Sequence, residues 1–254
     1  MALQARLIDP ITRRFFREAG IVPGMRVLDV GCGPGDTTFL AADLVGETGE
    51  VVGVDRAPAA LVAARRRAEA LSLHNVSFRE GDPADMLFEQ PFDAVVGRYV
   101  LVFQPDPAAM LRKLVAHVRP GGVVAFHEPD FDSERSFPPV PTYDRCCRWV
   151  AEALRLSGAD PHMGIKLFAA FVAAGLCAPS IRLESVITGG ANSADHVQFK
   201  TELACTLVPE MERLGVATAG EVDSETLAER MLAEVIATRS VIVGRSEIGA
   251  WSRV

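Results

Sequence analysis

Residues 27–36 read VLDVGCGPGD, an apolar run with one acid, followed by three glycines that alternate with other residues. Glycine is required where the backbone takes a positive φ or where a ligand approaches it closely. A loop of this kind, placed directly after a short β-rich run, indicates a turn that holds a ligand against its backbone. Several nucleotide cofactors bind to glycine loops, so the spacing and the neighbouring charges must tell them apart.

The spacing of Gly31, Gly33 and Gly35 differs from that of a dinucleotide-binding loop. The pattern G-x-G-x-x-G would place the third glycine at position 36, where this chain has Asp36. A carboxylate at that place would repel a pyrophosphate at the start of the following helix. A P-loop is also excluded, because no Gly-Lys-Ser/Thr follows the glycines.

Acids around a glycine loop suit a cofactor that carries positive charge, and S-adenosylmethionine carries an ammonium and a sulfonium. Asp29 is a candidate for the ammonium, directly or through water, while backbone N–H groups of the loop take the carboxylate. Asp55 ends the next apolar run and is placed to accept both ribose hydroxyls. Two plainer roles remain open: Asp29 could bond loop amides, and Asp55 could simply form a turn.

Short apolar runs alternate with helical patterns through the first half of the chain, and the runs lack the polar alternation of a one-sided sheet. The expected strands are 27–30, 51–54, 76–79, 94–97 and 123–127. The expected helices are 36–45, 58–72 and 106–117. Strands separated by helices indicate parallel βαβ units, and therefore a doubly wound α/β sheet covered on both faces.

The second half of the chain is less regular. We expect helices at 140–157, 162–175, 194–214 and 223–238, a strand at 181–188, and a closing strand pair of 241–243 with 247–253. The expected organisation is a single domain, with a cofactor-binding core and two candidate cap segments above the carboxyl edge of the sheet. The domain spans 1–254, the cofactor-binding core spans 20–130, and the candidate cap segments are 131–175 and 190–240. The N-terminal segment through Phe15 and Phe16 is expected to be helical and to complete the pocket.

Five segments, in order, resemble the class I S-adenosylmethionine-dependent methyltransferases, and the small-molecule members of the quinone-biosynthesis group in particular. The segments are VLDVGCGPGDTT, VVGVD, FREGDPADM, FDAVVGRYVL and VRPGGVVAFHEPD. The resemblance covers residues 20–130. It implies a mostly parallel, seven-stranded Rossmann-like sheet, with methyl transfer to oxygen, nitrogen or carbon of a small organic acceptor and S-adenosylhomocysteine as product.

The resemblance also implies a role for each matching residue along the cofactor. The glycines at 31, 33 and 35 line the methionine part, with Cys32 as a small filler between them, and Asp55 holds the ribose. The remaining positions are Arg56 beside the adenine, Gly81 and Asp82 at the adenine amino group, and Arg98 and Tyr99 beside the methionine moiety and the methyl group.

Two positions depart from the family pattern. Pro83 stands where the family often uses a backbone N–H toward the adenine ring, and proline has no such donor. Arg98 stands where the family often has a small or polar residue. Its guanidinium could reach the cofactor carboxylate or point into the substrate pocket, and the sequence leaves both open.

The candidate catalytic residues are His127 and Glu128, at the end of the fifth expected strand. A histidine there titrates near neutral pH and could accept a proton from a hydroxyl or an amine. The plainer alternative is that both side chains bond neighbouring loops and shape the pocket. His162 and His196 are expected to be surface or hydrogen-bonded histidines. No metal is expected, because nothing in the spacing supports a site made of His127, Glu128 and His162.

The composition narrows the possible partners. Acids outnumber Lys plus Arg by 33 to 26, which disfavours a nucleic-acid partner. No apolar run is long enough for a membrane span, and the five cysteines lack metal or disulfide spacing. We therefore expect a cytoplasmic enzyme, with a homodimer plausible. The alternatives are a nicotinamide-dependent oxidoreductase, which the loop spacing disfavours, and a non-catalytic protein that binds S-adenosylmethionine, for which a degraded loop would be expected.

Overall fold

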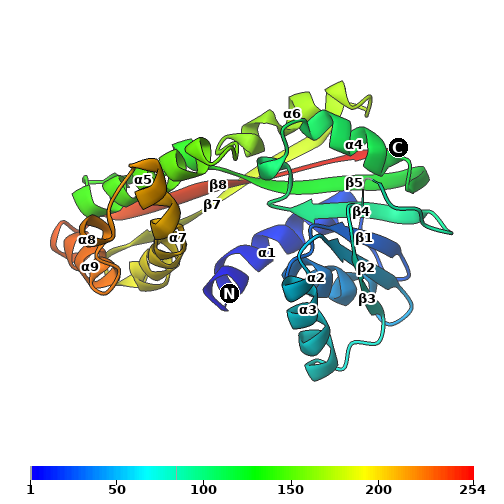
Figure 1. The fold of residues 1–254 in the computed structure, drawn as a ribbon, viewed down its shortest axis with the longest axis horizontal. Coiled ribbons are helices and arrows are strands. Elements are labelled where there is room, and N and C mark those ends of the chain that lie inside the picture. Colours follow the sequence, from blue (N-terminus) through cyan, green and yellow to red (C-terminus); the bar gives the residue numbers. More distant parts are fainter. Residues whose placement is uncertain (1, 84) are drawn as a thin grey trace. The chain divides into compact units, whose positions relative to one another are not determined.

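The computed structural model describes residues 2–83 and 85–254, so Met1 and Ala84, the latter within the segment FREGDPADM, lie outside the description. The chain forms two compact units, each assembled from three segments (Figure 1). We call residues 8–128, 165–182 and 248–254 the sheet unit. Residues 2–7, 129–164 and 183–247 form the helical unit. Each unit is described by itself.

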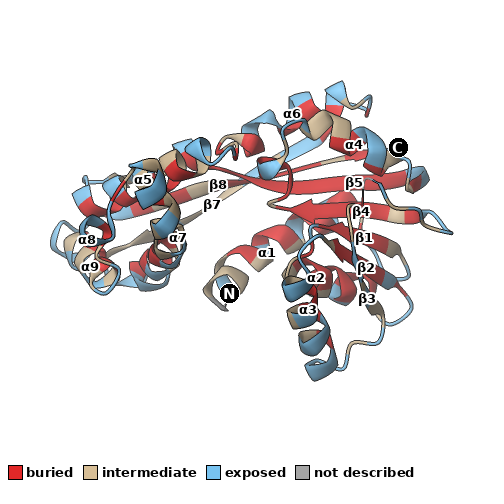
Figure 2. Cartoon of the chain, viewed as in Figure 1, coloured by how far each residue is buried: buried red, intermediate tan, exposed pale blue. Residues whose placement is uncertain are grey.

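Parallel strands form the centre of the sheet unit. The strands are β1 (Arg26–Val30), β2 (Glu50–Asp55), β3 (Val76–Glu80), β4 (Phe92–Arg98) and β5 (Val118–Asp130), in the order β3-β2-β1-β4-β5. Val27 of β1 is paired with Val51 on one side and Ala94 on the other. The last four residues of β1 are all buried (Figure 2), which confirms the expectation that both faces of the sheet are covered.

Two helices of the sheet unit begin where the sequence offers a cap or a fixed φ. The helices of this unit are α1 (Ala2–Ala19), α2 (Asp36–Val45), α3 (Pro58–Ala70), α4 (Pro107–Val115) and α6 (Met163–Ala173), of which α1 and α6 begin in the helical unit. Pro58 and Pro107 stand in the first turn, where a missing N–H is harmless. The Asp106 carboxylate accepts from the backbone N–H of Ala109 at 2.9 Å. Phe15 and Phe16 are fully buried on α1.

The helical unit packs an apolar core among its helices. Its elements are α5 (Pro141–Leu156), α7 (Ala194–Leu214), α8 (Ala219–Val222), α9 (Leu227–Ala237) and the short strand β6 (Arg135–Phe137). Tyr143, Val150, Met211 and Met231 are among the completely buried side chains of this core. Thr218 and Glu221 form a reciprocal capping box at the start of α8.

The sheet differs from the expected one in its last strands. Within the described residues it has eight strands, whereas the resemblance implies seven. The strand β6 was not expected, and β7 (Ser180–Gly189) lies beside β8. The expected closing pair is wrong: residues 241–253 form one strand, β8 (Val241–Arg253), whose first residues pair antiparallel with β6. Gly244, which the expected pair leaves between its two strands, lies inside β8 and serves close packing, since a Cβ there would lie 2.7 Å from Nε2 of His196.

Candidate functional site

The glycine loop between β1 and α2 has the backbone that its sequence predicts. Gly31, Gly33 and Gly35 all have positive φ angles, of 62°, 53° and 93°. A Cβ on Gly31 would meet Val100 at 2.8 Å, and one on Gly35 would meet the Phe39 ring at 2.6 Å. A Cβ on Gly33 would have no heavy atom within 4 Å. The loop therefore packs against Val100 at its first glycine and against Phe39 at its third, whereas the space beside Gly33 is open.

Asp55 joins two loops through its carboxylate. One oxygen accepts from the backbone N–H of Gly33 at 2.8 Å, and the other accepts from that of Ala57 at 2.8 Å. The side chain thus fixes the glycine loop to the turn that begins α3, which includes the turn-forming role left open by the sequence. Each oxygen has a second lone pair, so these two bonds do not exhaust its capacity to accept.

Asp29 is a buried carboxyl group with one oxygen unused. Its Oδ2 accepts from the Thr38 hydroxyl at 2.6 Å, whereas Oδ1 has no hydrogen-bond partner among the described residues. Burial raises the pKa of Asp29 to about 7, although Thr38 and the positive charge of Arg98 both favour the ionised form. A buried acceptor without a partner calls for an explanation, and a bound donor or cation would supply one.

A cavity of about 150 Å³ lies beside the loop within the sheet unit. Its lining includes six residues that the sequence singled out: Gly31, Asp55, Arg56, Gly81, Asp82 and Pro83. Arg56 forms an ion pair with Asp82 at its rim. Val100, Gln104 and Met110 also line the cavity, and sequence reasoning missed them: Val100 lies in the segment FDAVVGRYVL but received no role there, and the other two lie outside the matching segments.

Arg98 makes contacts that the sequence did not suggest. Its side chain is 3% exposed and donates to Asp9 at 2.6 Å and to Thr12 at 3.0 Å, both on α1. These contacts hold α1 against the end of β4. Tyr99, the next residue, has φ 59°, an uncommon value for a residue other than glycine, and its ring lies 5.3 Å from that of His127.

Glu128 and His127 are both buried at the end of β5, in different surroundings. The Glu128 carboxylate accepts from the backbone N–H groups of Val100, Leu101 and Val102, at 2.9, 2.8 and 3.2 Å. It therefore caps the 3-10 turn Leu101–Phe103. Nδ1 of His127 lies 3.0 Å from the Thr12 hydroxyl.

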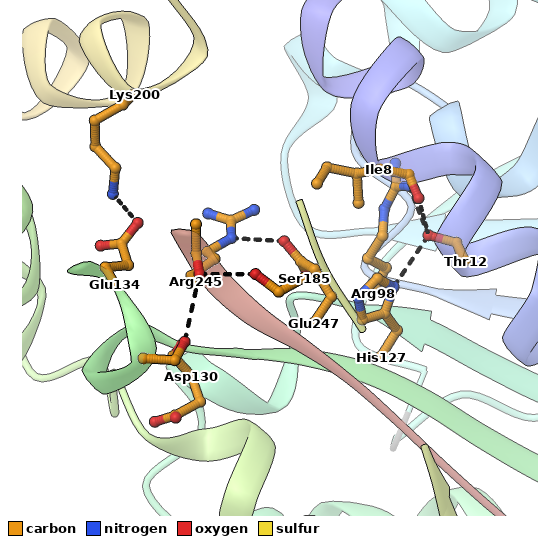
Figure 3. A network of polar contacts seen from close by, with 12 residues as sticks. Ile8, Thr12, Arg98, His127, Asp130, Glu134, Ser185, Lys200, Arg245 and Glu247 are labelled. Carbon is orange, nitrogen blue, oxygen red and sulfur yellow. Dashed lines mark hydrogen bonds and ion pairs between the residues drawn. The ribbon is translucent and has the colours of Figure 1, made fainter. Parts of the chain in front are cut away.

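The helical unit contains buried charges that sequence reasoning missed (Figure 3). Lys200 and Glu134 form an ion pair with side chains 3% and 2% exposed. Arg245 donates through Nε to Glu247 at 2.8 Å. The Phe131 ring faces both cations, at 5.5 Å from Lys200 and 5.3 Å from Arg245. Lys200 and Glu134 come from separate parts of the chain with no spacing that links them, whereas Arg245 and Glu247 lie two residues apart on β8, where the sequence pattern alone did not single them out.

His196 and His162 behave as ordinary hydrogen-bonded histidines within the helical unit. His196 is buried beside Thr188 and Tyr143, and burial, with smaller contributions from Lys200 and Arg245, lowers its pKa to about 4. Nδ1 of His162 lies 3.2 Å from Asp130 and 3.3 Å from Asp132. Nδ1 of His162 and carboxylate oxygens of Asp130 and Asp132 all lie within 4.8 Å of one another, and the two contacts of His162 account for this grouping.

A parallel sheet whose first strand ends in an alternating glycine loop, and whose second ends in an acid, defines the class I S-adenosylmethionine-dependent methyltransferases. The chain belongs to the methyltransferase domain family, which matches residues 21–156. The solved structure of geranyl diphosphate methyltransferase in complex with S-adenosylmethionine shares this fold, with a TM-score of 0.60 at 17% identity. The likeness covers 98% of this chain and 86% of that one.

Relatives of known name confirm the resemblance to the quinone-biosynthesis group. The chain is 36% identical over 140 residues to an aklanonic acid methyltransferase of a Streptomyces species, covering 55% of this chain and 63% of that protein. It is 38% identical over 136 residues to 2-phytyl-1,4-naphtoquinone methyltransferase of Synechococcus elongatus, covering 52% and 57%. The chain therefore spans little more than half the length of these relatives.

Proposed function

We propose that this chain transfers a methyl group from S-adenosylmethionine to a small organic acceptor, at oxygen, nitrogen or carbon. The observation that carries the proposal is the unused Oδ1 of Asp29, buried at the end of β1 and followed directly by the open glycine loop. A cationic ammonium suits that carboxylate, whereas the pyrophosphate of a dinucleotide does not. Asp36, where a dinucleotide loop needs a glycine, is bound to Arg67 at 2.6 Å.

The chemistry of the loop and cavity residues supports a place for each part of the cofactor. Asp29 would take the ammonium, and the open backbone at Gly33 would allow the methionine part to approach closely. The lone pairs of Asp55 that remain after its two amide bonds would accept the ribose hydroxyls. Arg56 and Asp82, with Gly81 and Pro83, would surround the adenine end of the same cavity. Pro83 offers no N–H there, and so recognition at that point would use other groups.

The bound sulfonium would supply an electrophilic methyl group, and the chain would contribute position and a water-poor site. We place proton acceptance at His127, whose imidazole suits an acceptor that starts protonated. The contacts of Glu128 support a capping role, because its carboxylate already serves three backbone donors. Arg98 would act through α1, which it fixes in place, rather than through the cofactor.

The acceptor class rests on the named relatives and on charge. Their names specify aklanonic acid, a phytylnaphthoquinone and demethylmenaquinone as substrates of those proteins. The net charge of −7 favours a small molecule over a nucleic acid. Within the described residues, no helix combines the length and apolarity that crossing a bilayer requires. A cytoplasmic location, a homodimer, a 20–130 cofactor core and cap segments at 131–175 and 190–240 complete the proposal.

Calorimetric titration with S-adenosylmethionine, S-adenosylhomocysteine and NADH tests the proposal. We expect both S-adenosyl compounds to bind, and binding to weaken at least about tenfold in Asp29→Asn and in Asp55→Asn, since each loses a charged hydrogen-bond acceptor. Asp43→Asn is the matched control, because Asp43 is an exposed residue of α2 paired with Arg13. Binding of NADH alone would instead support the oxidoreductase alternative.

A further inference from the structure

Four polar side chains form a connected group in the interior of the sheet unit. Asp9 and Thr12 come from α1, Arg98 from the end of β4 and His127 from β5 (Figure 3 shows Thr12, Arg98 and His127). Thr12 and His127 are 0% exposed. The capping role of Glu128 does not involve this group, and the cofactor cavity does not include Thr12. Neither feature therefore explains why these four polar side chains are connected in the interior.

The Thr12 hydroxyl stands at the junction of three contacts. Its oxygen lies 3.0 Å from an Arg98 nitrogen, 3.0 Å from Nδ1 of His127 and 3.3 Å from the carbonyl oxygen of Ile8. A hydroxyl has one hydrogen to donate and two lone pairs that accept. Arg98 can only donate, and the Ile8 carbonyl can only accept. If all three contacts are hydrogen bonds, the hydroxyl donates to Ile8 and His127 must donate through Nδ1.

We infer that Thr12 is a positioning residue that keeps the ring proton of neutral His127 on Nδ1. In the opposite arrangement the hydroxyl hydrogen would point to Nδ1, the Ile8 contact would be lost, and one lone pair would remain unused in a dry interior. Asp9 holds Arg98 in place, so the guanidinium always occupies one lone pair of Thr12.

The imidazole plane is fixed by ring contacts as well as by this bond. The Phe15 ring meets the imidazole edge to face, at 4.9 Å and 82°, and the Tyr99 ring lies at 5.3 Å and 61°. Turning the imidazole over would therefore require these aromatic rings to move. The Thr12 bond favours one position of the ring proton, and the two rings fix the plane in which it lies.

The consequence for chemistry rests on the proposed function. With the proton on Nδ1, Nε2 has the lone pair and is the basic nitrogen of the ring. When the acceptor forms its bond to the methyl carbon and the carbon–sulfur bond breaks, the acceptor's proton would move to Nε2. The resulting imidazolium would still donate to Thr12 through Nδ1, so the Thr12 hydroxyl would not have to reorient during the step.

Nitrogen-15 NMR of the full chain, labelled at histidine, tests the inference. At about pH 8.5, above the ordinary pKa of imidazole, the two ring nitrogens report directly which one is protonated. We expect Nδ1 to be protonated in the wild type and in Thr12→Ser, which keeps the hydroxyl. Thr12→Val keeps the shape but removes the acceptor, and we expect it to shift the proton largely to Nε2. His127→Gln identifies the signals.

The outcomes separate this inference from the proposed function. Protonation of Nε2 in the wild type, or an unchanged Nδ1 proton in Thr12→Val, would overturn the positioning role of Thr12. Titration of the same wild-type sample with S-adenosylhomocysteine addresses the proposed function. Failure of that ligand to bind would count against methyl transfer, and the ring-proton assignment would still be decided by the NMR result.

Discussion

The two units bury charge in opposite ways. The helical unit neutralises its own buried groups: Lys200 is paired with Glu134, Arg245 with Glu247, and His196 is held neutral. The sheet unit instead buries the Asp29 carboxyl without an ion pair among the described residues, with only the Thr38 hydroxyl as hydrogen-bond donor. Buried polar atoms without a hydrogen bond occur in the helical unit too, such as Ser193 Oγ and Thr201 Oγ1, so an unused atom alone does not mark a site. The comparison teaches that Asp29 is set apart as an acid buried without a paired cation beside the glycine loop.

The same contrast predicts opposite responses to pH. Asp29 has a folded pKa of about 7 against an ordinary value of 3.8, so the folded state holds a proton that the unfolded state releases. Its contribution to stability therefore falls as pH rises from about 4 to about 7. His196 has a folded pKa of about 4 against 6.5, so its contribution falls as pH drops through that interval.

Breaking the buried pair of the helical unit should have the largest effect. Lys200→Met leaves the Glu134 carboxylate buried without its cation, and we expect the free energy of unfolding to fall by about 3 to 5 kcal/mol. Urea denaturation at neutral pH measures the change. Adding Glu134→Leu to that variant should restore most of the loss, because an apolar pair needs no charge. If the double variant were as unstable as Lys200→Met, the uncompensated charge of Glu134 would not be the cause of the loss.

Removing the charge of Asp29, in the sheet unit, should increase the free energy of unfolding, whereas Lys200→Met should decrease it. Asn at position 29 can still accept from Thr38, and it has no charge to bury. Asp29→Asn should raise the free energy of unfolding at pH 8 by up to about 4 kcal/mol, with little change at pH 4. Urea titrations at the two pH values measure this, with Asp43→Asn as control. An equal change at both pH values would contradict the burial of a charge as the cause.

Replacing the buried imidazole should remove the acid sensitivity of the helical unit. In the wild type, we expect the His196 contribution to decline by up to about 3 kcal/mol between pH 6.5 and pH 4. His196→Gln, which retains polar atoms without titrating, should show a flatter stability profile over this interval. Urea denaturation across the range compares the two. Parallel profiles would mean that other groups set the acid response.

The smallest effect on stability should come with a specific effect on binding. Gly33 and Gly46 both have positive φ, and a Cβ on either meets no heavy atom within 4 Å. Alanine at either position should reduce stability by about 1 kcal/mol, through backbone strain alone. Only Gly33→Ala should weaken S-adenosylhomocysteine binding, by at least about tenfold, because its methyl group enters the open loop. Equal binding by both variants would place the cofactor elsewhere.

Much of the sheet unit could be predicted from sequence because its signals are local. Each of these signals follows from one local physical cause. The structure has the positive-φ glycines, the buried strands and the acid at the end of β2 where the sequence predicts them. The long-range partners could not be predicted. Arg98 and Asp9 are far apart in the chain, as are Lys200 and Glu134, and only the folded chain brings each pair together. Gly244 shows a further limit, because a packing glycine and a turn glycine look alike in sequence.

The segmented make-up of the sheet unit has a consequence for synthesis on the ribosome. Residues 248–254 belong to this unit, yet all residues of the helical unit precede them in the chain. Val254 exchanges backbone hydrogen bonds with Gly121 and Gly122, more than a hundred residues earlier. The edge of β5 that these residues cover must therefore wait, unpaired, until residues 248–254 have been synthesised, after the whole helical unit. Translation speed and chaperone protection during that interval would decide the yield of folded protein.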